Sequence, residues 1–342
     1  MTEITLTGVN GITFPNMATW GWEIALYLFL GGLVAGLMIF GGALRLLGGD
    51  QFKRATLISD LTAFPILAIG MLLLLLDLSN KINVWQLYTT IQLASPMSWG
   101  AWILLAAMIV LALKFVAVIP APNAMSLFGV KVFQPISPPT EESEEVRAEK
   151  PSALVRSIEW TWTRLDALRQ QVEKRNPLIS IVCIALGIGV GFYTGILLSS
   201  IPARPLWNSS ILAPLFLISG AESGSAFLCL FLPHDEHRRL VPFSILMCGI
   251  ELLLILAYAL NLIYGAQSNQ RAGELLFTGI FALWFWGGVV LIGLIIPALV
   301  ESFEAARRPL AFVPARVPPL LKLAGGMTLR FVIVYAGLLS FV

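Results

Sequence analysis

The sequence predicts an all-α integral membrane protein with eight transmembrane helices and a long cytoplasmic loop between the third and the fourth. Hydrophobic residues make up 57% of the chain and charged residues only 12%, so a soluble domain of this composition would expose large apolar patches. Apolar runs of roughly 20 residues, the length that crosses a hydrocarbon core about 30 Å thick, recur eight times. Basic residues gather in alternate loops, as they do in multi-pass proteins.

The predicted helices follow the apolar runs in chain order. They cover residues 20–46, 57–77, 99–119, 178–199, 211–232, 241–264, 278–299 and 320–341. We expect residues 1–342 to form a single membrane domain. The first run contains small residues that let its helix approach a neighbour closely: Gly31, Gly32, Ala35 and Gly36.

The charges of the loops predict the orientation of the helices. The loops after the even-numbered helices contain only Lys81, Arg204 and Arg271. Most basic residues lie after the odd-numbered helices: Lys53, Arg54, Arg147, Lys150, Arg156, Arg164, Arg169, Lys174, Arg175, Arg238, Arg239, Arg307, Arg308 and Arg316. By the positive-inside rule the second set of loops is cytoplasmic. Because the number of helices is even, both termini then lie outside.

The third loop, residues 121–177, is the one segment of soluble character. It begins with a proline-rich stretch, VFQPISPPT, and an acidic tract with glutamates at 141, 142, 144 and 145, which is typical of a flexible linker. From Ser152 to Lys174 apolar residues recur at helical spacing with arginines on the other faces. This pattern indicates an amphipathic helix on the membrane surface that connects the two parts of the helical bundle.

Residue counts argue against several classes of function. A net charge of +2 gives no indication of nucleic acid as a partner. The three cysteines, Cys183, Cys229 and Cys248, lie inside apolar runs without a CxxC pair, so we expect no iron–sulfur cluster and no zinc site. The only histidines, His234 and His237, fall in the loop after the fifth helix, where they are expected to be exposed. They cannot ligate a haem within the membrane, and as a metal site they lack an obvious third ligand.

The predicted topology brings polar residues from four helix ends to the outer surface. The first helix begins there, the second and fourth end there, and the third begins there after SPMSWG. The candidate site residues in this group are Trp22, Glu23, Asp77, Ser98, Trp99 and Tyr193. Ionisable groups at membrane depth usually face a bundle interior or a cavity. Two structural alternatives remain open: the tryptophans can form an interfacial belt, and Asp77 can pair with Lys81 one turn away.

A second charged group lies deeper, near the middle of the last helices. Glu222, Glu251 and Arg330 belong to the fifth, sixth and eighth predicted helices. They form either a buried ion pair that fixes the bundle or a proton relay that couples events across the membrane. Asp60 and Lys114 lie nearer the cytoplasmic surface, which their side chains can reach by snorkelling.

Several motifs in order resemble the NrfD/PsrC family, the integral membrane subunits of polysulfide-reductase-type complexes. They are WxxAxYLFLGG at 22–32, LLxDL at 74–78 with a following tryptophan, SPMSWGAW at 95–102, YTGxLL at 193–198, PLWNS at 205–209, PxFxxSG at 214–220 and GGxxxR at 325–330. Each motif alone is weak, and their order along nearly the whole chain makes the resemblance strong. The third loop lies outside it.

The resemblance implies two four-helix bundles without a redox cofactor and a quinone pocket near the outer face of the first four helices. The quinone, which we expect to be menaquinone, would be bound by Tyr193, the residue that matches the family's pocket tyrosine through the Y-x-G motif. A histidine found near the start of the first helix in some relatives is absent from TWGWEI here. We therefore expect Glu23 or Asp77 to take its place, with Trp22, Ser98 and Trp99 beside the ring.

The resemblance also implies the partners. They are a subunit with four [4Fe–4S] clusters on the outer face of the bacterial inner membrane and a catalytic subunit, often a molybdopterin enzyme. The protein would thus be a component of an oxidoreductase rather than an enzyme by itself. One alternative within the family is a proton-translocating subunit of a larger quinol-oxidising complex that uses Glu222, Glu251 and Arg330. A more distant alternative is a secondary transporter, although the helix-interrupting prolines do not occur in matched halves.

Overall fold

The computed structural model describes residues 20–78, 81–89, 92, 95–118, 153–201, 203–306 and 313–340, without the side chains of 50, 87 and 153–163. Within these residues eight helices are long and apolar enough to cross a membrane, which confirms the predicted fold class. They are α1 (Trp22–Leu47), α2 (Lys53–Asp77), α4 (Pro96–Val118), α6 (Asn176–Ser199), α7 (Leu212–Phe231), α8 (His234–Tyr264), the continuous pair η7 (Leu283–Ile295) and α10 (Ile296–Ala305), and α11 (Val317–Leu339). The proline-rich and acidic part of the linker and the segment before residue 20 lie outside the described residues.

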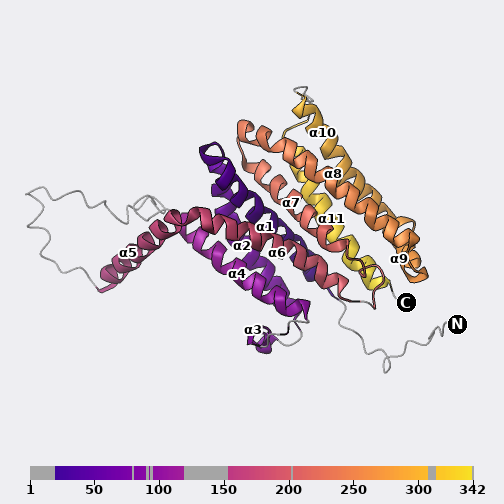
Figure 1. Cartoon of the computed structure of the whole chain (residues 1–342), viewed down its shortest axis with the longest axis horizontal. Helices are drawn as coiled ribbons and strands as arrows, with labels where there is room; N and C mark the ends of the chain where they lie inside the picture. Colours follow the sequence, from indigo (N-terminus) through magenta and orange to yellow (C-terminus); the bar gives the residue numbers. More distant parts are fainter. Residues whose placement is uncertain are drawn as a thin grey trace, which may run out of the picture.

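The helices form two groups (Figure 1). The first bundle contains α1, α2, α4 and α6, and the second contains α7, α8, η7 with α10, and α11. The two bundles meet where α1 packs against α7 and α11 and where α6 packs against α7. Helix α2 crosses the molecule from one end to the other. Asp60, near its start, and Asp77, at its end, therefore mark opposite ends of the molecule. We call these ends the Asp77 end and the Asp60 end.

The contact between α1 and α7 depends on the small residues of α1. A Cβ atom on Gly224 of α7 would lie only 2.6 Å from the Cα atom of Gly36, and one on Gly220 would lie 3.0 Å from the Cα atom of Gly32. Side chains at these positions would therefore push the two backbones apart. Small residues allow this close approach between membrane helices, where packing rather than the hydrophobic effect drives association.

The sixth span starts earlier than the sequence predicts. α8 begins at His234 rather than at residue 241, so the charged residues HDEHRR form the first helical turns instead of a loop. Pro233, in extended conformation, precedes the helix, and Asp235 and Glu236 lie in its first turn. Negative side chains at this position interact favourably with the positive end of the helix dipole. Periodicity of apolar residues could not reveal these turns, because the side chains in them are mostly polar.

The seventh span differs in position and in helical type. Instead of a helix over 278–299, the structure has a π-helix, η7, that continues into α10 and ends at Ala305. A short amphipathic helix, α9 (Gln267–Phe277), precedes it and was not predicted from the sequence. α9 lies at the Asp77 end, as does the short helix α3 (Gln86–Thr89) between α2 and α4 (Figure 1).

Helix α5 (Ala153–Lys174) lies within the segment for which an amphipathic helix is expected. It extends away from the bundle beside the start of α6 (Figure 1). Near its end, the Arg169 side chain donates a hydrogen bond of 3.4 Å to the backbone carbonyl of Val116 in α4. This contact and the packing of α5 against α4 and α6 attach its carboxyl-terminal part to the first bundle.

Candidate functional site

Two carboxylates meet at the start of α1. The Asp77 carboxylate lies next to the backbone N–H of Gly21 and beside the charge of Glu23. The Glu23 carboxylate folds back over Gly21 so closely that a Cβ atom there would overlap its oxygen. Both side chains are partly exposed. Among the described residues Asp77 forms no ion pair with Lys81, so the pairing that the spacing allowed is not the arrangement seen.

Three tyrosines from three helices form a cluster at the same end of the molecule as these carboxylates. Tyr27 of α1, Tyr88 of α3 and Tyr193 of α6 lie within electrostatic range of one another. Tyr27 is four residues, or about one turn, further into the membrane than Glu23 on the same helix. Burial raises the pKa of the Tyr88 phenol, so this hydroxyl is neutral and able to donate a hydrogen bond at neutral pH.

Tyr193 is positioned by a glycine on the neighbouring helix. A Cβ atom on Gly100 of α4 would overlap the Tyr193 ring and approach its hydroxyl, so the ring occupies the space that a larger residue at 100 would need. Tyr193 is 6% exposed and Tyr27 is 1% exposed. The Tyr27 hydroxyl is buried and has no hydrogen-bond partner among the residues that the structure describes. Such orphaned groups are costly, which indicates a polar partner that is not part of the described chain.

The other predicted site residues have different positions. Ser98 is buried, and its hydroxyl accepts a hydrogen bond of 3.2 Å from the backbone N–H of Gln92, which holds the segment that leads into α4. Trp22 and Trp99 are 53% and 48% exposed, respectively, so their rings face outward rather than into the tyrosine cluster. Their positions at helix ends are typical of an interfacial aromatic belt.

The RPLWN segment after α6 contacts the second bundle. The Trp207 indole donates a hydrogen bond of 2.8 Å to the carbonyl of Ile333 and stacks on Trp20, with 5.1 Å between ring centroids. The Arg204 side chain donates to the carbonyl of Leu338, and Tyr258 donates a 2.6 Å hydrogen bond to the carbonyl of Leu206. This segment therefore closes the second bundle at the Asp77 end and contacts Trp20, which precedes α1.

The deep charged residues come together as the sequence predicts, but in a larger cluster. Arg330 donates to the Ser219 hydroxyl and, over 3.2 Å, to the carbonyl of Phe216, and Glu251 faces Glu222 and Arg330. The sequence reasoning missed Lys322, which donates 2.7 Å and 2.6 Å hydrogen bonds to Glu301 and Ser244. Lys322 precedes Arg330 by eight residues, about two helical turns, and that spacing was the available signal.

His237 is buried rather than exposed. It is 3% exposed, its Nδ1 atom lies 3.2 Å from the carbonyl of Cys229, and its Nε2 atom lies 3.6 Å from a carboxylate oxygen of Glu304. The expectation of two exposed loop histidines was wrong for this residue because the segment is helical and packs against α10. No group of three or more potential metal-ligating side chains occurs in the described part of the protein.

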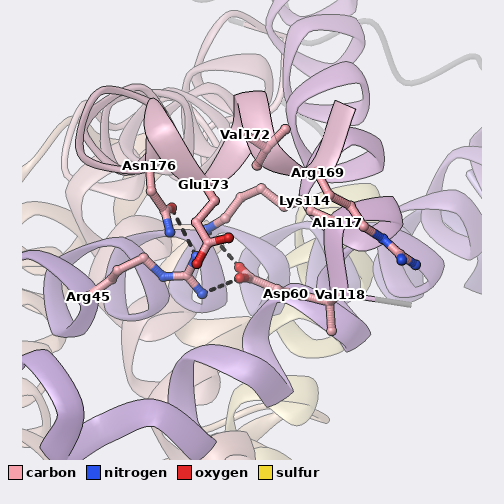
Figure 2. A pocket seen from close by; sticks show the side chains of 9 residues that line it. All are labelled: Arg45, Asp60, Lys114, Ala117, Val118, Arg169, Val172, Glu173 and Asn176. Atoms are coloured by element: carbon pink, nitrogen blue, oxygen red, sulfur yellow. Dashed lines mark hydrogen bonds and ion pairs between the residues drawn. The ribbon is translucent and has the colours of Figure 1, made fainter. Parts of the chain in front are cut away.

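A separate cavity of about 270 Å³ lies at the Asp60 end, between α4, α5, α6 and the adjoining ends of α1 and α2. Figure 2 shows Arg45 and Lys114 directed at Asp60. Lys114 lies 2.6 Å from one Asp60 oxygen, Arg45 pairs with the other, and Arg45 also donates a 2.9 Å hydrogen bond to Asn176. Asp60 and Lys114 are 2% and 3% exposed, so they form a buried ion cluster and do not snorkel. This cavity contains none of the predicted site residues.

Comparison with known proteins decides the family. Residues 12–342 match the family described as "Polysulphide reductase, NrfD", a range that runs across the linker as well as the eight helices. The chain belongs to the NrfD family. It is 28% identical to Protein NrfD of Escherichia coli (strain K12), over 98% of this sequence and 99% of the relative.

Two further relatives carry names that refer to reductases. One, a component of the polysulfide reductase of Wolinella succinogenes, is 29% identical, over 94% of this sequence and 95% of its own length. The other, a component of the selenate reductase of Mesobacillus selenatarsenatis, is 25% identical, over 88% of this sequence and 70% of its own length. The resemblance that the sequence motifs indicated is therefore confirmed, and this NrfD-family protein is a multi-pass membrane protein.

Proposed function

We propose that this NrfD-family protein is the quinone- or quinol-reactive membrane subunit of a respiratory oxidoreductase complex. The observation that carries the proposal is the cluster of Tyr27, Tyr88 and Tyr193 at the end of the molecule where the Glu23 and Asp77 carboxylates also meet. A quinone has two oxygens that accept hydrogen bonds and an apolar ring, and the site offers phenol donors among apolar side chains. The orphaned Tyr27 hydroxyl is a group that such a ligand would satisfy.

The tyrosines and the carboxylates of the site have different tasks in this proposal. Tyr193, held against Gly100, donates a hydrogen bond to one ligand oxygen, and Tyr27 lies one turn inside the rim to donate to the ligand as well. Oxidation of a quinol releases two electrons and two protons. The carboxylates of Asp77 and Glu23 then accept those protons at the rim, where both side chains are partly exposed and can pass them to water.

The partner follows from what the residues of this protein can do. None of the proposed site residues can store an electron, so the redox partner must dock close to the tyrosines. We place an iron–sulfur subunit with four [4Fe–4S] clusters, and beyond it a catalytic subunit such as a molybdopterin enzyme, on the Asp77 end. Because basic residues are concentrated at the other end, we propose that the Asp77 end is the outer face of the bacterial inner membrane. We further propose menaquinone as the quinone, as the family resemblance suggests.

The test is a titration of the assembled complex with a fluorescent quinol analogue, combined with quinol turnover. Asp77→Asn, Glu23→Gln and Tyr193→Phe are compared with the wild type after co-purification has verified that the complex is intact. We expect Tyr193→Phe to weaken binding, and the two carboxylate variants to lower turnover more than binding because they act on protons.

Matched controls come from exposed residues outside the site. Tyr264→Phe changes a tyrosine that is 81% exposed, and Glu274→Gln changes an exposed glutamate of α9. Both are expected to leave binding and turnover unchanged. Normal binding and turnover in all three site variants would contradict the proposal and leave Asp77 as an anchor at a helix end.

A second candidate function, proton translocation within a larger quinol-oxidising complex, is favoured by the buried charges of the second bundle. Glu222, Glu251 and Arg330, which we propose as parts of a proton path, are each at most 4% exposed. Through Lys322 and Glu301 they extend toward the His237–Glu304 pair at the Asp60 end. A Glu251→Gln complex that retains electron transfer but moves fewer protons per electron would support this function, and an unchanged ratio would exclude Glu251 from the path.

A further inference from the structure

Five charged side chains lie together inside the second bundle. They are Glu222 of α7, Glu251 of α8, Glu301 of α10, and Lys322 and Arg330 of α11, and each is between 1% and 4% exposed. Three of these groups are carboxyls and two are cations. If all five were ionised, the cluster would keep one uncompensated negative charge in the membrane interior. Burying a charge in that way is far more costly than binding a proton.

The hydrogen bonds within the cluster identify the carboxyl groups that are poorly compensated. Both oxygens of Glu301 receive donors: Lys322 at 2.7 Å and the Ser244 hydroxyl at 3.3 Å. Glu301 is therefore well suited to carry a negative charge. Oε1 of Glu222 lies 3.2 Å from the Lys322 ammonium but makes no hydrogen bond with it or with any other described residue. Oε2 of Glu251 is also without a partner among these residues.

The carboxyl groups of Glu222 and Glu251 face each other at hydrogen-bonding range. Two ionised carboxylates offer only acceptors, so neither can satisfy the other. A single proton placed between them supplies the missing donor and removes the excess negative charge at the same time. Closely spaced carboxyl groups are known to hold one proton jointly for this reason.

We propose that Glu222 and Glu251 form a carboxyl dyad that stores one proton at neutral pH in the middle of the second bundle. The dyad is a proton-binding site, and it stands on the geometry and charge balance of the cluster, whether or not the complex moves protons across the membrane. If the second candidate function holds, the dyad is the group from which a proton is released and to which it returns.

The groups around the dyad come from four elements. α7 contributes Ser219 and Cys229, α8 contributes Ser244 and Cys248, α10 contributes Glu301 and Glu304, and α11 contributes Lys322 and Arg330, while His237 of α8 lies against Glu304. Lys322 contacts both Glu222 and Glu301, so it links the dyad to the acidic groups nearer the Asp60 end. The positive charge of Lys322 balances one carboxylate, so the cluster needs one stored proton rather than two to become neutral.

Infrared spectroscopy of the resting full-length protein in detergent tests the proposal without any quinol or turnover. A protonated carboxyl group has a C=O stretch that is separate from the carboxylate bands and that shifts in D2O. The difference spectrum between wild type and Glu251→Gln should contain the band of one carboxylic acid, because the variant cluster is neutral without a stored proton. Glu222→Gln should give the same loss. Glu274→Gln, the exposed control, should remove only carboxylate intensity.

For Lys322→Met we expect the acid band to grow rather than to disappear. A loss of the band through misfolding of the variant would not produce that increase. Without the lysine, three carboxyl groups face one cation, so the cluster should bind a second proton and the acid band of the cluster should grow about twofold. A difference spectrum in which Glu251→Gln and Glu222→Gln remove carboxylate bands and no acid band would overturn the dyad. The infrared result does not depend on whether Tyr193→Phe retains or loses quinol turnover. The dyad and the proposed quinone site can therefore be refuted independently.

Discussion

At the scale of single residues, two glycines determine where the proposed site residues lie. Gly21 leaves room for the Glu23 carboxylate to fold back toward Asp77, and Gly100 leaves room for the ring of Tyr193. In each case the side chain of the proposed site fills the volume that a Cβ atom would occupy. The motifs SPMSWG and TWGWEI are therefore informative at their glycines as much as at their polar residues.

This contact predicts that Gly100→Ala will impair the site without changing any polar group. The added methyl group overlaps the Tyr193 ring, which must move or push α4 away from α6. We expect weaker binding of the quinol analogue and lower turnover, at least as severe as in Tyr193→Phe, in a complex that still assembles. The control is Gly249→Ala, whose new methyl group meets no atom within 4 Å. Wild-type binding in Gly100→Ala would show that Tyr193 is not held in place by this contact.

A second residue-scale prediction concerns the ion cluster at the Asp60 end. Lys114→Met removes one of the two cations that neutralise the buried Asp60 carboxylate. Breaking a buried pair in this way costs about 3 kcal/mol, so thermal unfolding in detergent should begin at a lower temperature. The double variant Asp60→Leu with Lys114→Met should recover part of the loss, whereas the exposed control Lys174→Met should have no effect. A single variant as stable as the wild type would contradict the role of this pair.

At the scale of elements, the crossing of α1 and α7 joins the two bundles through backbone contacts. We predict that Gly224→Leu separates them, because its side chain would have to enter the space of the Gly36 backbone and no flexible group can yield. Overpacking of this kind costs at least about 1–3 kcal/mol, so the variant should lose thermal stability and assemble poorly with its partners. Size-exclusion chromatography and thermal unfolding measure both effects. Gly249→Leu, at a glycine with open surroundings, is the matched control.

The elements also reveal how far sequence reasoning reaches. Long apolar runs predicted the eight spans, because a bilayer demands about 20 apolar residues in helical form and few sequences satisfy that by chance. The polar first turns of α8, the short helix α9 and the π-helix η7 were missed or misplaced. Their helical state depends on packing against neighbouring helices rather than on the composition of one segment.

Some positions of the predicted site residues could be foreseen from the sequence, and others could not. Topology alone indicated that Glu23, Asp77 and Tyr193 lie at one end, since it places the ends of α1, α2 and α6 together. It could not indicate that Trp22 and Trp99 face outward or that Tyr27 and Tyr88 belong beside Tyr193. Rotation of a helix about its own axis decides which side chains face the interior, and that rotation follows from packing against its neighbours. Lys322 and Glu301 were overlooked because they lie closer to helix ends than Arg330 does.

At the scale of the whole molecule, the charges of the two ends predict its orientation in the membrane. Arg238 lies exposed in the first turns of α8 at the Asp60 end, and Arg271 lies exposed on α9 at the Asp77 end. The positive-inside rule predicts that the Asp60 end is cytoplasmic. The three native cysteines are buried, so they should contribute little background to thiol labelling. In intact cells, a membrane-impermeant maleimide should label Arg271→Cys and should leave Arg238→Cys unlabelled until the membrane is opened. The reverse pattern would place the tyrosine cluster on the cytoplasmic side. The iron–sulfur partner would then have to dock inside the cell, and protons from quinol oxidation would be released there rather than outside.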